Sequence, residues 1–198
     1  PYNKEEYMRL KAKTDARLGV WRCGPRPLTK TTLRLRADNA AAMDAVFNDV
    51  AQECLDRNNL KAYQTKCDSK ETYLTRPDLG RVFDDETAAQ IKKDCVNDPD
   101  VQIIVSDGLS SSAVEANIDA VLPALFNGLK SNGLKVGTPI FIKYGRVGAE
   151  DSVAKILNVV SNIHKNGTPP VEAGAYIAEL CEQMYKKKAS GLDLKATN

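Results

Sequence analysis

The sequence is poor in the side chains that most often bind metal ions or exchange protons at neutral pH. His164 is the single histidine among 198 residues, which excludes a metal site built from several histidines. The cysteines are odd in number, scattered and never spaced as Cys-x-x-Cys, so they indicate neither a disulfide framework nor a zinc site. We expect reduced, mostly buried thiols in a cytosolic protein at Cys23, Cys54, Cys67, Cys95 and Cys181.

Long apolar runs and an excess of one charge are also missing. No stretch approaches the roughly 20 apolar residues that a membrane helix needs, and no segment resembles a signal peptide. The 28 Lys and Arg residues nearly balance the 26 Asp and Glu residues, which argues against a nucleic-acid or membrane-surface footprint. We therefore expect a soluble protein with no nucleic acid and no membrane among its partners.

The chain is predicted to divide at residue 35. Residues 1–35 are expected to form an N-terminal helical arm and loop, in which residues 3–17 carry a thin apolar stripe at helical spacing. That stripe indicates either an exposed helix or an arm that docks elsewhere. Residues 21–27 contain two prolines and a glycine, which predicts an irregular loop or a hinge. Residues 36–198 are expected to form the main domain.

The first half of that domain is predicted to be mainly helical. Residues 37–56 place apolar side chains on one face, with Asp38 as the N-cap. Residues 84–97 form a second helix with a buried face. Between them, residues 60–67 contain short runs that are typical of a strand.

The clearest pattern is a strand, a turn and a helix over residues 101–132. Residues 101–105 are mostly apolar and β-branched, as in a parallel strand that is covered on both faces. Ser112 and Glu115 have the spacing of a capping box at a helix start. The helix that follows carries a buried stripe formed by Ile118, Val121, Leu122, Leu125 and Leu129.

A second unit repeats this order. Residues 140–143 form a short apolar strand, residues 144–148 a turn, and residues 150–157 a helix that is short for covering a sheet. A further turn at residues 161–170 leads into a helix over residues 171–188. The repeated order predicts an α/β fold: an open, mainly parallel sheet flanked by helices.

Three turns, residues 106–112, 144–148 and 161–170, are expected at the carboxyl ends of the strands, where open α/β sheets bind ligands. Asp107 and Gly108 in the first turn offer a carboxylate and accessible backbone, and Arg146 in the second lies between glycines. Taken alone, a well-capped turn and a solvated arginine are the more frequent explanations.

Catalytic machinery is not indicated by the residues themselves. His164 has no nucleophile with a supporting acid beside it in the sequence, so a structural role is favoured. A glycine fingerprint for nucleotides is also missing. The residues predict a binding edge with no catalytic residue and no metal site.

Eight sequence blocks, taken in order, identify the chain far more specifically than any one of them alone. They are Cys-Gly-Pro-Arg-Pro (23–27), Tyr-Leu-Thr-Arg-Pro-Asp-Leu-Gly-Arg (73–81), Val-Ser-Asp-Gly-Leu-Ser (105–110), Val-Gly-Thr-Pro (136–139), Tyr-Gly-Arg-Val (144–147), Ser-Asn-Ile-His (161–164), Gly-Thr-Pro-Pro-Val-Glu-Ala (167–173) and Lys-Ala-Ser-Gly (188–191). With these blocks, the chain from about residue 18 onward resembles the small (light) subunit of ethanolamine ammonia-lyase.

The resemblance implies a Rossmann-like fold and a subunit of an adenosylcobalamin-dependent enzyme that converts ethanolamine to acetaldehyde and ammonia by a radical mechanism. It also implies a hetero-oligomer in which a large TIM-barrel subunit holds the substrate and the catalytic residues. The small subunit is expected to enclose the cobalamin, which carries its own cobalt, at the subunit interface. The expected location is cytoplasmic, within a bacterial microcompartment.

Cofactor contacts follow from the matching motifs. The valine of Gly-Arg-Val corresponds to Val147, and the residue two before Ser-Asn-Ile-His corresponds to Val159. With the turn residues added, the predicted cofactor-binding set is Val147, Arg146, Val159, Asp107 and Gly108, of which Val147 and Arg146 rank above Asp107 and Gly108. The family carries a further strand and a glutamate-bearing loop that have no counterpart here. We therefore expect a missing segment between residues 157 and 158.

Two rival functions come from other classes of protein. One is a non-enzymatic assembly or interaction module of a bacterial microcompartment complex, in which the turns contact only protein and the N-terminal helix docks into a larger particle. The other is a stand-alone Rossmann-like nucleotide binder, which the missing glycine fingerprint disfavours.

Overall fold

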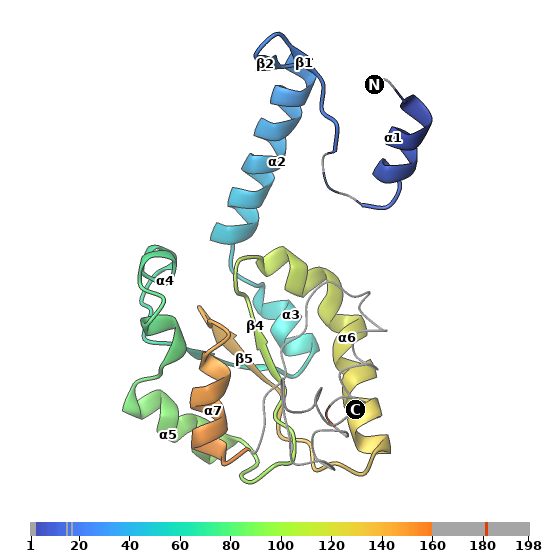
Figure 1. The fold of residues 1–198 in the computed structure, drawn as a ribbon. Coiled ribbons are helices and arrows are strands. Elements are labelled where there is room, and N and C mark those ends of the chain that lie inside the picture. Colours follow the sequence, from blue (N-terminus) through green and yellow to red (C-terminus); the bar gives the residue numbers. More distant parts are fainter. Residues whose placement is uncertain (1–2, 15, 17, 160–180, 182–198) are drawn as a thin grey trace, which may run out of the picture. The chain divides into compact units, whose positions relative to one another are not determined.

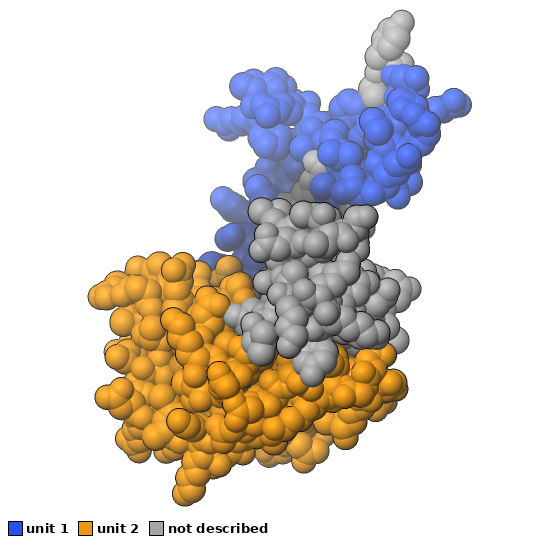
Figure 2. Space-filling view, turned by 60° about the horizontal axis from the view of Figure 1, so that its bottom comes forward, with its two compact units in different colours: residues 1–44 blue, residues 45–198 orange. Residues whose placement is uncertain are grey.

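The computed structural model describes residues 3–14, 16, 18–159 and 181 of the chain. They belong to two compact units, Pro1–Asp44 and Ala45–Asn198, which Figure 2 colours blue and orange. The turn predicted at residues 161–170, with His164, lies outside the described residues. So does the helix predicted at residues 171–188, except for Cys181.

The N-terminal unit contains an exposed helix and a small hairpin (Figure 1). Helix α1, Lys4–Lys11, has no buried residue, so a helix forms within residues 3–17 as predicted. Strands β1, Arg22–Cys23, and β2, Arg26–Pro27, pair antiparallel. The prediction of a wholly irregular loop is therefore wrong, because Gly24 has a φ of +60° and allows the chain to reverse within two residues.

The single helix predicted over residues 37–56 is also wrong. The chain forms two helices there, α2, Thr29–Phe47, and α3, Gln52–Arg57. Asp38 caps neither of them, since it lies inside α2 and accepts a hydrogen bond from Arg34 Nε at 3.0 Å. An ion pair of this spacing stabilises the interior of a helix. The helix start was predicted wrongly because aspartate also favours N-cap positions.

The second unit is built around three parallel strands: β3, Lys61–Gln64, β4, Ile104–Ser106, and β5, Ile140–Lys143. Their order in the sheet is β3-β5-β4, which puts β5 in the centre. Ile142 of β5 lies opposite Tyr63 of β3 and also opposite Ser106 of β4. The carboxyl ends of all three strands therefore meet at one edge.

The strand predictions hold for β3 and β5 but are shifted for β4. The strand within residues 60–67 and the strand at residues 140–143 are confirmed. The strand predicted at residues 101–105 begins later, because Val101 forms only an isolated bridge with Val136. The Gln102 side chain also donates a hydrogen bond to the Thr138 carbonyl at 2.6 Å, between the backbone bonds from Gly137 N–H to Val101 and from Ile140 N–H to Ile103.

Helices cover both faces of the sheet. Phe141 of β5 belongs to a core shared with α3 and α6, Ser111–Ser131. Its neighbours Ile140 and Ile142 belong to a second core, shared with α5, Asp85–Asp94, and α7, Ala149–Leu157. This alternation follows from the two-residue period of a strand. The predicted α/β class, with a parallel sheet flanked by helices, is confirmed. No helix in the described part of the chain is long and apolar enough to cross a bilayer.

Helix α6 begins with a cap other than the predicted one. The Ser110 hydroxyl accepts a hydrogen bond from the Ala113 N–H at 3.2 Å, so Ser112 and Glu115 do not form the expected capping box. The Glu115 carboxylate instead accepts from the Ala51 N–H at 2.7 Å, which ties α6 to the start of α3. The predicted buried stripe of α6 is confirmed at Ile118, Leu122, Leu125 and Leu129.

The cysteines are free, and four of the five are buried, as predicted. The exposed one is Cys23. Burial raises the pKa of the Cys181 thiol to about 11, because an apolar environment disfavours the thiolate. The buried thiols therefore act as small apolar side chains of the core.

Candidate functional site

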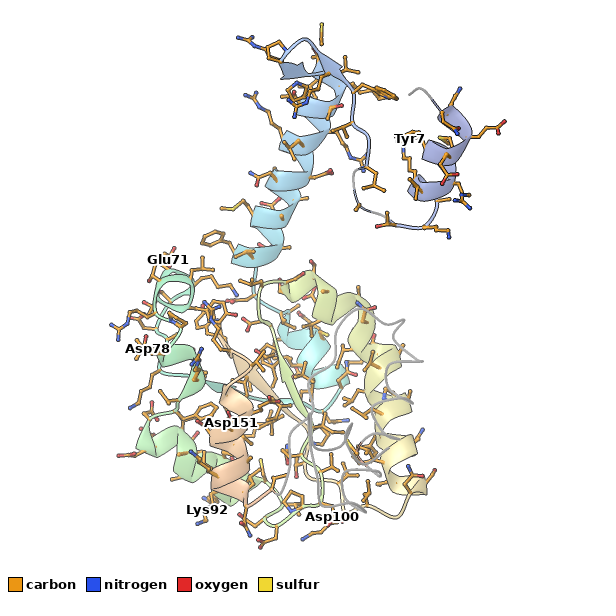
Figure 3. The ribbon with its side chains drawn as sticks, in the orientation of Figure 1. Tyr7, Glu71, Asp78, Lys92, Asp100 and Asp151 are labelled. Carbon is orange, nitrogen blue, oxygen red and sulfur yellow. The ribbon has the colours of Figure 1, made fainter. Side chains whose placement is uncertain are left out.

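The carboxyl edge of the sheet gathers one polar or aromatic residue from the end of each strand. There β3 runs into Thr65, β4 into Asp107 and β5 into Tyr144. In Figure 3, Glu71 marks this side of the unit and Asp100 marks the opposite side. Parallel sheets bind ligands at this edge, so the candidate site is built from these turns.

A buried ion pair lies at the centre of the edge. Lys70, the first residue of α4, Lys70–Thr75, places its ammonium 3.3 Å from the Asp107 carboxylate and 3.4 Å from the Gly108 carbonyl oxygen. The side chains of Lys70 and Asp107 are only 6% and 1% exposed. The ammonium also lies 5.2 Å from the ring centroids of both Tyr73 and Tyr144, and their faces replace part of the water that the cation has lost.

The other carboxylate oxygen of Asp107 holds the neighbouring turn. It accepts a hydrogen bond from the Tyr144 N–H at 2.9 Å. Tyr144 has a φ of +57°, a left-handed conformation that is unfavourable for a residue with a side chain. The Thr65 hydroxyl donates to the Tyr144 carbonyl at 3.0 Å, and the Ser106 hydroxyl donates to the Gly145 carbonyl at 3.0 Å. Both neighbouring strands therefore hold the turn after β5.

Arg146 turns back onto α4. Its Nη2 donates to the Tyr73 carbonyl at 2.6 Å, and its guanidinium carbon lies 4.3 Å from the centroid of the Tyr73 ring. Its backbone N–H donates to the Gly80 carbonyl at 2.8 Å. Burial raises the pKa of Tyr73, and the nearby guanidinium offsets part of that rise. Arg146 is thus half-buried and hydrogen-bonded, and it is not a freely solvated surface arginine.

Gly80 makes this close approach of Arg146 feasible. A Cβ atom at Gly80 would lie 2.8 Å from Arg146 Cγ and 3.2 Å from the Tyr144 carbonyl oxygen. These distances are too short for a side chain without displacement of one of the two groups. The 3-10 turn η1, Leu79–Arg81, therefore packs directly against the turn that follows β5.

The same turns expose apolar side chains. Val147 is 55% exposed and Leu109 is 54% exposed, although each lies within a few residues of a buried strand end. Gly108, beside Leu109, has a φ of +49° and open space where a side chain would stand. Two exposed apolar side chains on neighbouring, well-bonded turns suit the face of a flat, largely apolar ligand.

The predicted cofactor contacts divide into two places. Four of them lie together in the turns after β4 and β5: Asp107, Gly108, Arg146 and Val147. The fifth, Val159, follows α7 and packs against the core on the side of α5 and α7. Its neighbour Asn158 donates to the Asp98 carboxylate at 2.6 Å, ahead of the amino end of β4. The structure therefore does not bring Val159 to the carboxyl edge.

Sequence reasoning did not find Lys70, Thr65 or Tyr73. Lys70 lies in a polar stretch and has the appearance of a solvated lysine, because its partner Asp107 is 37 residues away in the sequence. Tyr73 had one available signal, since it begins the conspicuous block at residues 73–81. Burial of a charged side chain by a distant partner leaves no local pattern.

The chemical capacity of the edge is binding and orientation. The Asp107 carboxylate is already engaged by Lys70 and by the Tyr144 N–H, so it is not available as a general base. Among the residues that the structure describes, no group of three or more His, Cys, Asp or Glu could hold a metal ion. A cofactor with its own reactive centre would supply what these residues lack.

Comparison with known proteins gives a consistent result. The family model "Ethanolamine ammonia-lyase light chain (EutC)" matches residues 4–159 and 157–195. The chain is 46% identical to the ethanolamine ammonia-lyase small subunit of Fusobacterium nucleatum, over 98% of the chain and 78% of that protein. It is 46% identical to the small subunit of Clostridium perfringens (98% and 79%) and 42% identical to that of Listeria monocytogenes (98% and 80%).

The relatives contain residues that have no counterpart in this chain. The alignment with the Fusobacterium protein runs over 231 positions, whereas the chain has 198 residues. The match to the family model is divided into two stretches, which meet at residues 157–159. This junction lies at the end of α7, next to Val159.

Proposed function

Because the chain belongs to the ethanolamine ammonia-lyase light chain family, we propose that its carboxyl edge encloses adenosylcobalamin against the large subunit of that carbon–nitrogen lyase. The enzyme converts ethanolamine to acetaldehyde and ammonia. The observation that carries the proposal is Val147, an apolar side chain kept 55% exposed on a turn that two neighbouring strands hold in place.

The residues at the edge fit a corrin ring. A corrin presents a broad, largely apolar face with amide groups around its rim. Val147 and Leu109 offer exposed apolar surface to such a face, and the open space at Gly108 lets the backbone approach a rim amide closely. No charged side chain has to be displaced, because Lys70 and Asp107 are already paired.

Each residue has a defined part in this proposal. Val147 contacts the ring, Gly108 offers its backbone to the rim, and Arg146 holds the turn through Tyr73. When bound, adenosylcobalamin supplies the one-electron chemistry, and the protein supplies position and exclusion of water. The residues of this chain therefore act by binding and orienting.

Val159 belongs to the proposed cofactor-binding set, although the structure places it against the core on the side of α5 and α7. We assign Val159 to the cofactor from its place two residues before Ser-Asn-Ile-His. The longer relatives support a further segment between residues 157 and 158. Such a segment can carry the chain from the end of α7 back to the carboxyl edge.

The proposed partner is a large TIM-barrel subunit that holds the substrate and the catalytic residues in a hetero-oligomer. The relatives are named small subunits, which supports a larger partner. The N-terminal unit offers it an apolar surface, because the described residues of α1 and α2 include no buried side chain. Exposed large apolar residues in this unit include Met8, Leu10, Leu33, Leu35 and Met43, and such surfaces commonly form interfaces.

The finer description of fold and location is part of the same proposal. Parallel strands that each lead through a turn into a helical segment support a Rossmann-like domain, which the additional residues of the relatives would extend. A cytoplasmic location inside a bacterial microcompartment is proposed from the family resemblance.

Reconstitution tests the proposed function directly. The large subunit and adenosylcobalamin are incubated with ethanolamine, with and without this chain, and acetaldehyde is measured. We expect acetaldehyde formation only when the chain is present. Persistent activity without the chain would show that it is not a required subunit.

An assembly module is the second candidate function. It is favoured by the exposed apolar side chains of the N-terminal unit, which need only a protein partner. Under that function, substitutions at Val147 alter assembly and leave cofactor affinity unchanged. Cofactor affinity of the assembled complex therefore separates the two candidates.

A further inference from the structure

We propose that the Lys70–Asp107 ion pair is a positioning device that holds Tyr144 in its left-handed conformation and so sets the place of Val147. This inference rests on the proposed function, because the place of Val147 matters only if the carboxyl edge binds the cofactor. It also changes the role of Asp107, which becomes a positioning residue behind the site and does not touch the ligand.

The burial of the pair argues for such a role. With side chains that are 6% and 1% exposed, Lys70 and Asp107 have both given up their hydration. Replacement of such pairs by apolar side chains of similar volume is often neutral or stabilising, so stability alone does not account for this one. The pair does provide directed bonds, because Lys70 Nζ and Asp107 Oδ1 each bond to a particular backbone group.

Those backbone groups belong to the two turns of the site. Lys70 Nζ donates to the Gly108 carbonyl at 3.4 Å, in the turn after β4. Asp107 Oδ1 accepts from the Tyr144 N–H at 2.9 Å, in the turn after β5. The pair thus fastens α4 to one turn and that turn to the next.

The hydrogen bond to Tyr144 matters because of the backbone conformation of this residue. A φ of +57° is unfavourable for tyrosine, and such residues persist only where surrounding bonds determine them. Loss of the Asp107 acceptor leaves the Tyr144 N–H without its partner and favours relaxation of the backbone. Val147 follows three residues later, so a change of φ at Tyr144 redirects the turn that carries it.

Two charge-neutral double variants separate positioning from charge and volume. In Lys70→Met/Asp107→Asn, the amide oxygen at position 107 still accepts from the Tyr144 N–H. In Lys70→Met/Asp107→Leu, no acceptor remains. Neither variant leaves an unpaired buried charge, which would be strongly destabilising. The variants differ chiefly in the hydrogen bond from the Tyr144 N–H at 2.9 Å, and also in the longer one from the Ser106 hydroxyl at 3.4 Å.

The measured quantity is the dissociation constant of adenosylcobalamin for the complex of this chain with its large subunit, obtained by equilibrium dialysis. We expect the Leu variant to bind roughly tenfold more weakly than the Asn variant, the factor that corresponds to about 1.4 kcal/mol. Equal affinities of the two variants overturn the proposal, whether both are weak or both are strong, because the acceptor then has no effect. Hydrogen exchange at residues 144–148 in the complex gives a readout that is independent of the cofactor, with faster exchange expected in the Leu variant.

Ser106→Ala keeps the proposal testable if the Leu variant does not assemble. It removes the hydroxyl that donates to the Gly145 carbonyl at 3.0 Å, a milder loosening of the same turn. We expect a dissociation constant roughly three times that of the unmodified complex, since a neutral hydrogen bond contributes modestly. An unchanged constant in this variant contradicts the positioning role.

Asp49→Asn is the matched control for loss of an ion pair. The exposed carboxylate of Asp49 pairs at 2.7 Å with Lys143, whose ammonium lies near the Tyr144 ring but bonds no backbone group of the turn. We expect no change in cofactor affinity. If the unmodified complex does not bind adenosylcobalamin at all, the proposed function fails. If it binds and the two double variants are alike, only the positioning role fails.

Discussion

The guanidinium of Arg146 lies over the ring of Tyr73, 4.3 Å from its centroid, and donates to the carbonyl oxygen of the same residue. One side chain thus makes both a cation–π contact and a directed hydrogen bond to α4. Arg146 is bonded inward while Val147, the next residue, points to solvent. The predicted contacts at these two positions therefore have different physical roles, and substitutions should separate them.

Arg146→Lys tests the planar contact. Lysine keeps the charge but lacks the flat, forked guanidinium, so we expect a decrease of about 1 kcal/mol in the free energy of unfolding and a moderate loss of cofactor affinity. Urea unfolding and equilibrium dialysis measure the two effects. The control is Arg76→Lys, at an arginine that pairs on the exposed surface with Asp78, and we expect no measurable change there. Equal effects at both positions contradict the assigned role.

Val147→Glu tests the exposed contact. We expect the apparent KM for adenosylcobalamin to rise about tenfold or more, because a hydrated carboxylate would have to lose water against an apolar ring. The free energy of unfolding should stay within about 0.5 kcal/mol, as is usual for exposed positions. Val96→Glu is the control, since Val96 is 40% exposed and follows α5, away from the carboxyl edge. A KM that moves equally in both variants rejects the proposed site.

Asp94 is expected to contribute to acid sensitivity. Its hydrogen bonds from Lys61 and Tyr63 lower the pKa of the carboxyl group below 3.8. A lowered pKa means that this stabilisation is complete above about pH 3.8 and is lost as the pH falls through the folded-state value. Asp94→Asn should therefore lower stability at pH 7 and weaken its dependence on pH in the acid range, as measured by urea unfolding.

Asp56→Asn provides the comparison for that experiment. The Asp56 carboxylate accepts a hydrogen bond from the neutral side chain of Gln52 at 2.8 Å, which an asparagine can replace in kind. We expect the acid dependence of this variant to follow that of the unmodified chain. Identical acid profiles for the Asp94 and Asp56 variants would show that the Lys61–Asp94 pair does not contribute.

The thiols should differ sharply in reactivity. Iodoacetamide attacks the thiolate, and a thiol with a pKa of about 11, such as Cys181, is ionised in only about one molecule in a thousand at pH 8. Burial also raises the pKa of Cys54 and Cys95. We expect mass spectrometry to find early labelling at the exposed Cys23 alone. Labelling in guanidinium chloride should reach all five cysteines, and equal native rates would contradict the buried core.

Local patterns predicted the elements that bury one continuous face. The strand at residues 140–143 and the apolar stripe of α6 were both found, because periodic apolar residues report which face of an element is covered. Helix starts were less predictable. Asp38 and Ser112 have the chemistry of caps, but Arg34 bonds Asp38 within α2, and Ser110 caps α6 two residues earlier.

Only part of the candidate site could be predicted from the sequence, for a related reason. Gly108 lies in a turn whose composition marks it as accessible, whereas Val147 was indicated by the resemblance of Gly-Arg-Val to the family motif. Lys70 and Thr65 reach the same edge only through tertiary contacts. The inward path of Arg146 depends on Gly80, which has to lack a side chain. Contacts that join segments far apart in the chain are not encoded in any short pattern.

The hydrogen bonds that hold Tyr144 also imply that the site forms late in the folding of the chain. Thr65 and Tyr144 are 79 residues apart, and Lys70 and Asp107 are 37 apart. Contacts of this span close large loops, so they form slowly and gain from the prior ordering of the segments between them. On a ribosome, nothing of the edge can be completed before β5 has been synthesised. Under the proposed function, a partly folded chain would therefore lack the cofactor-binding edge.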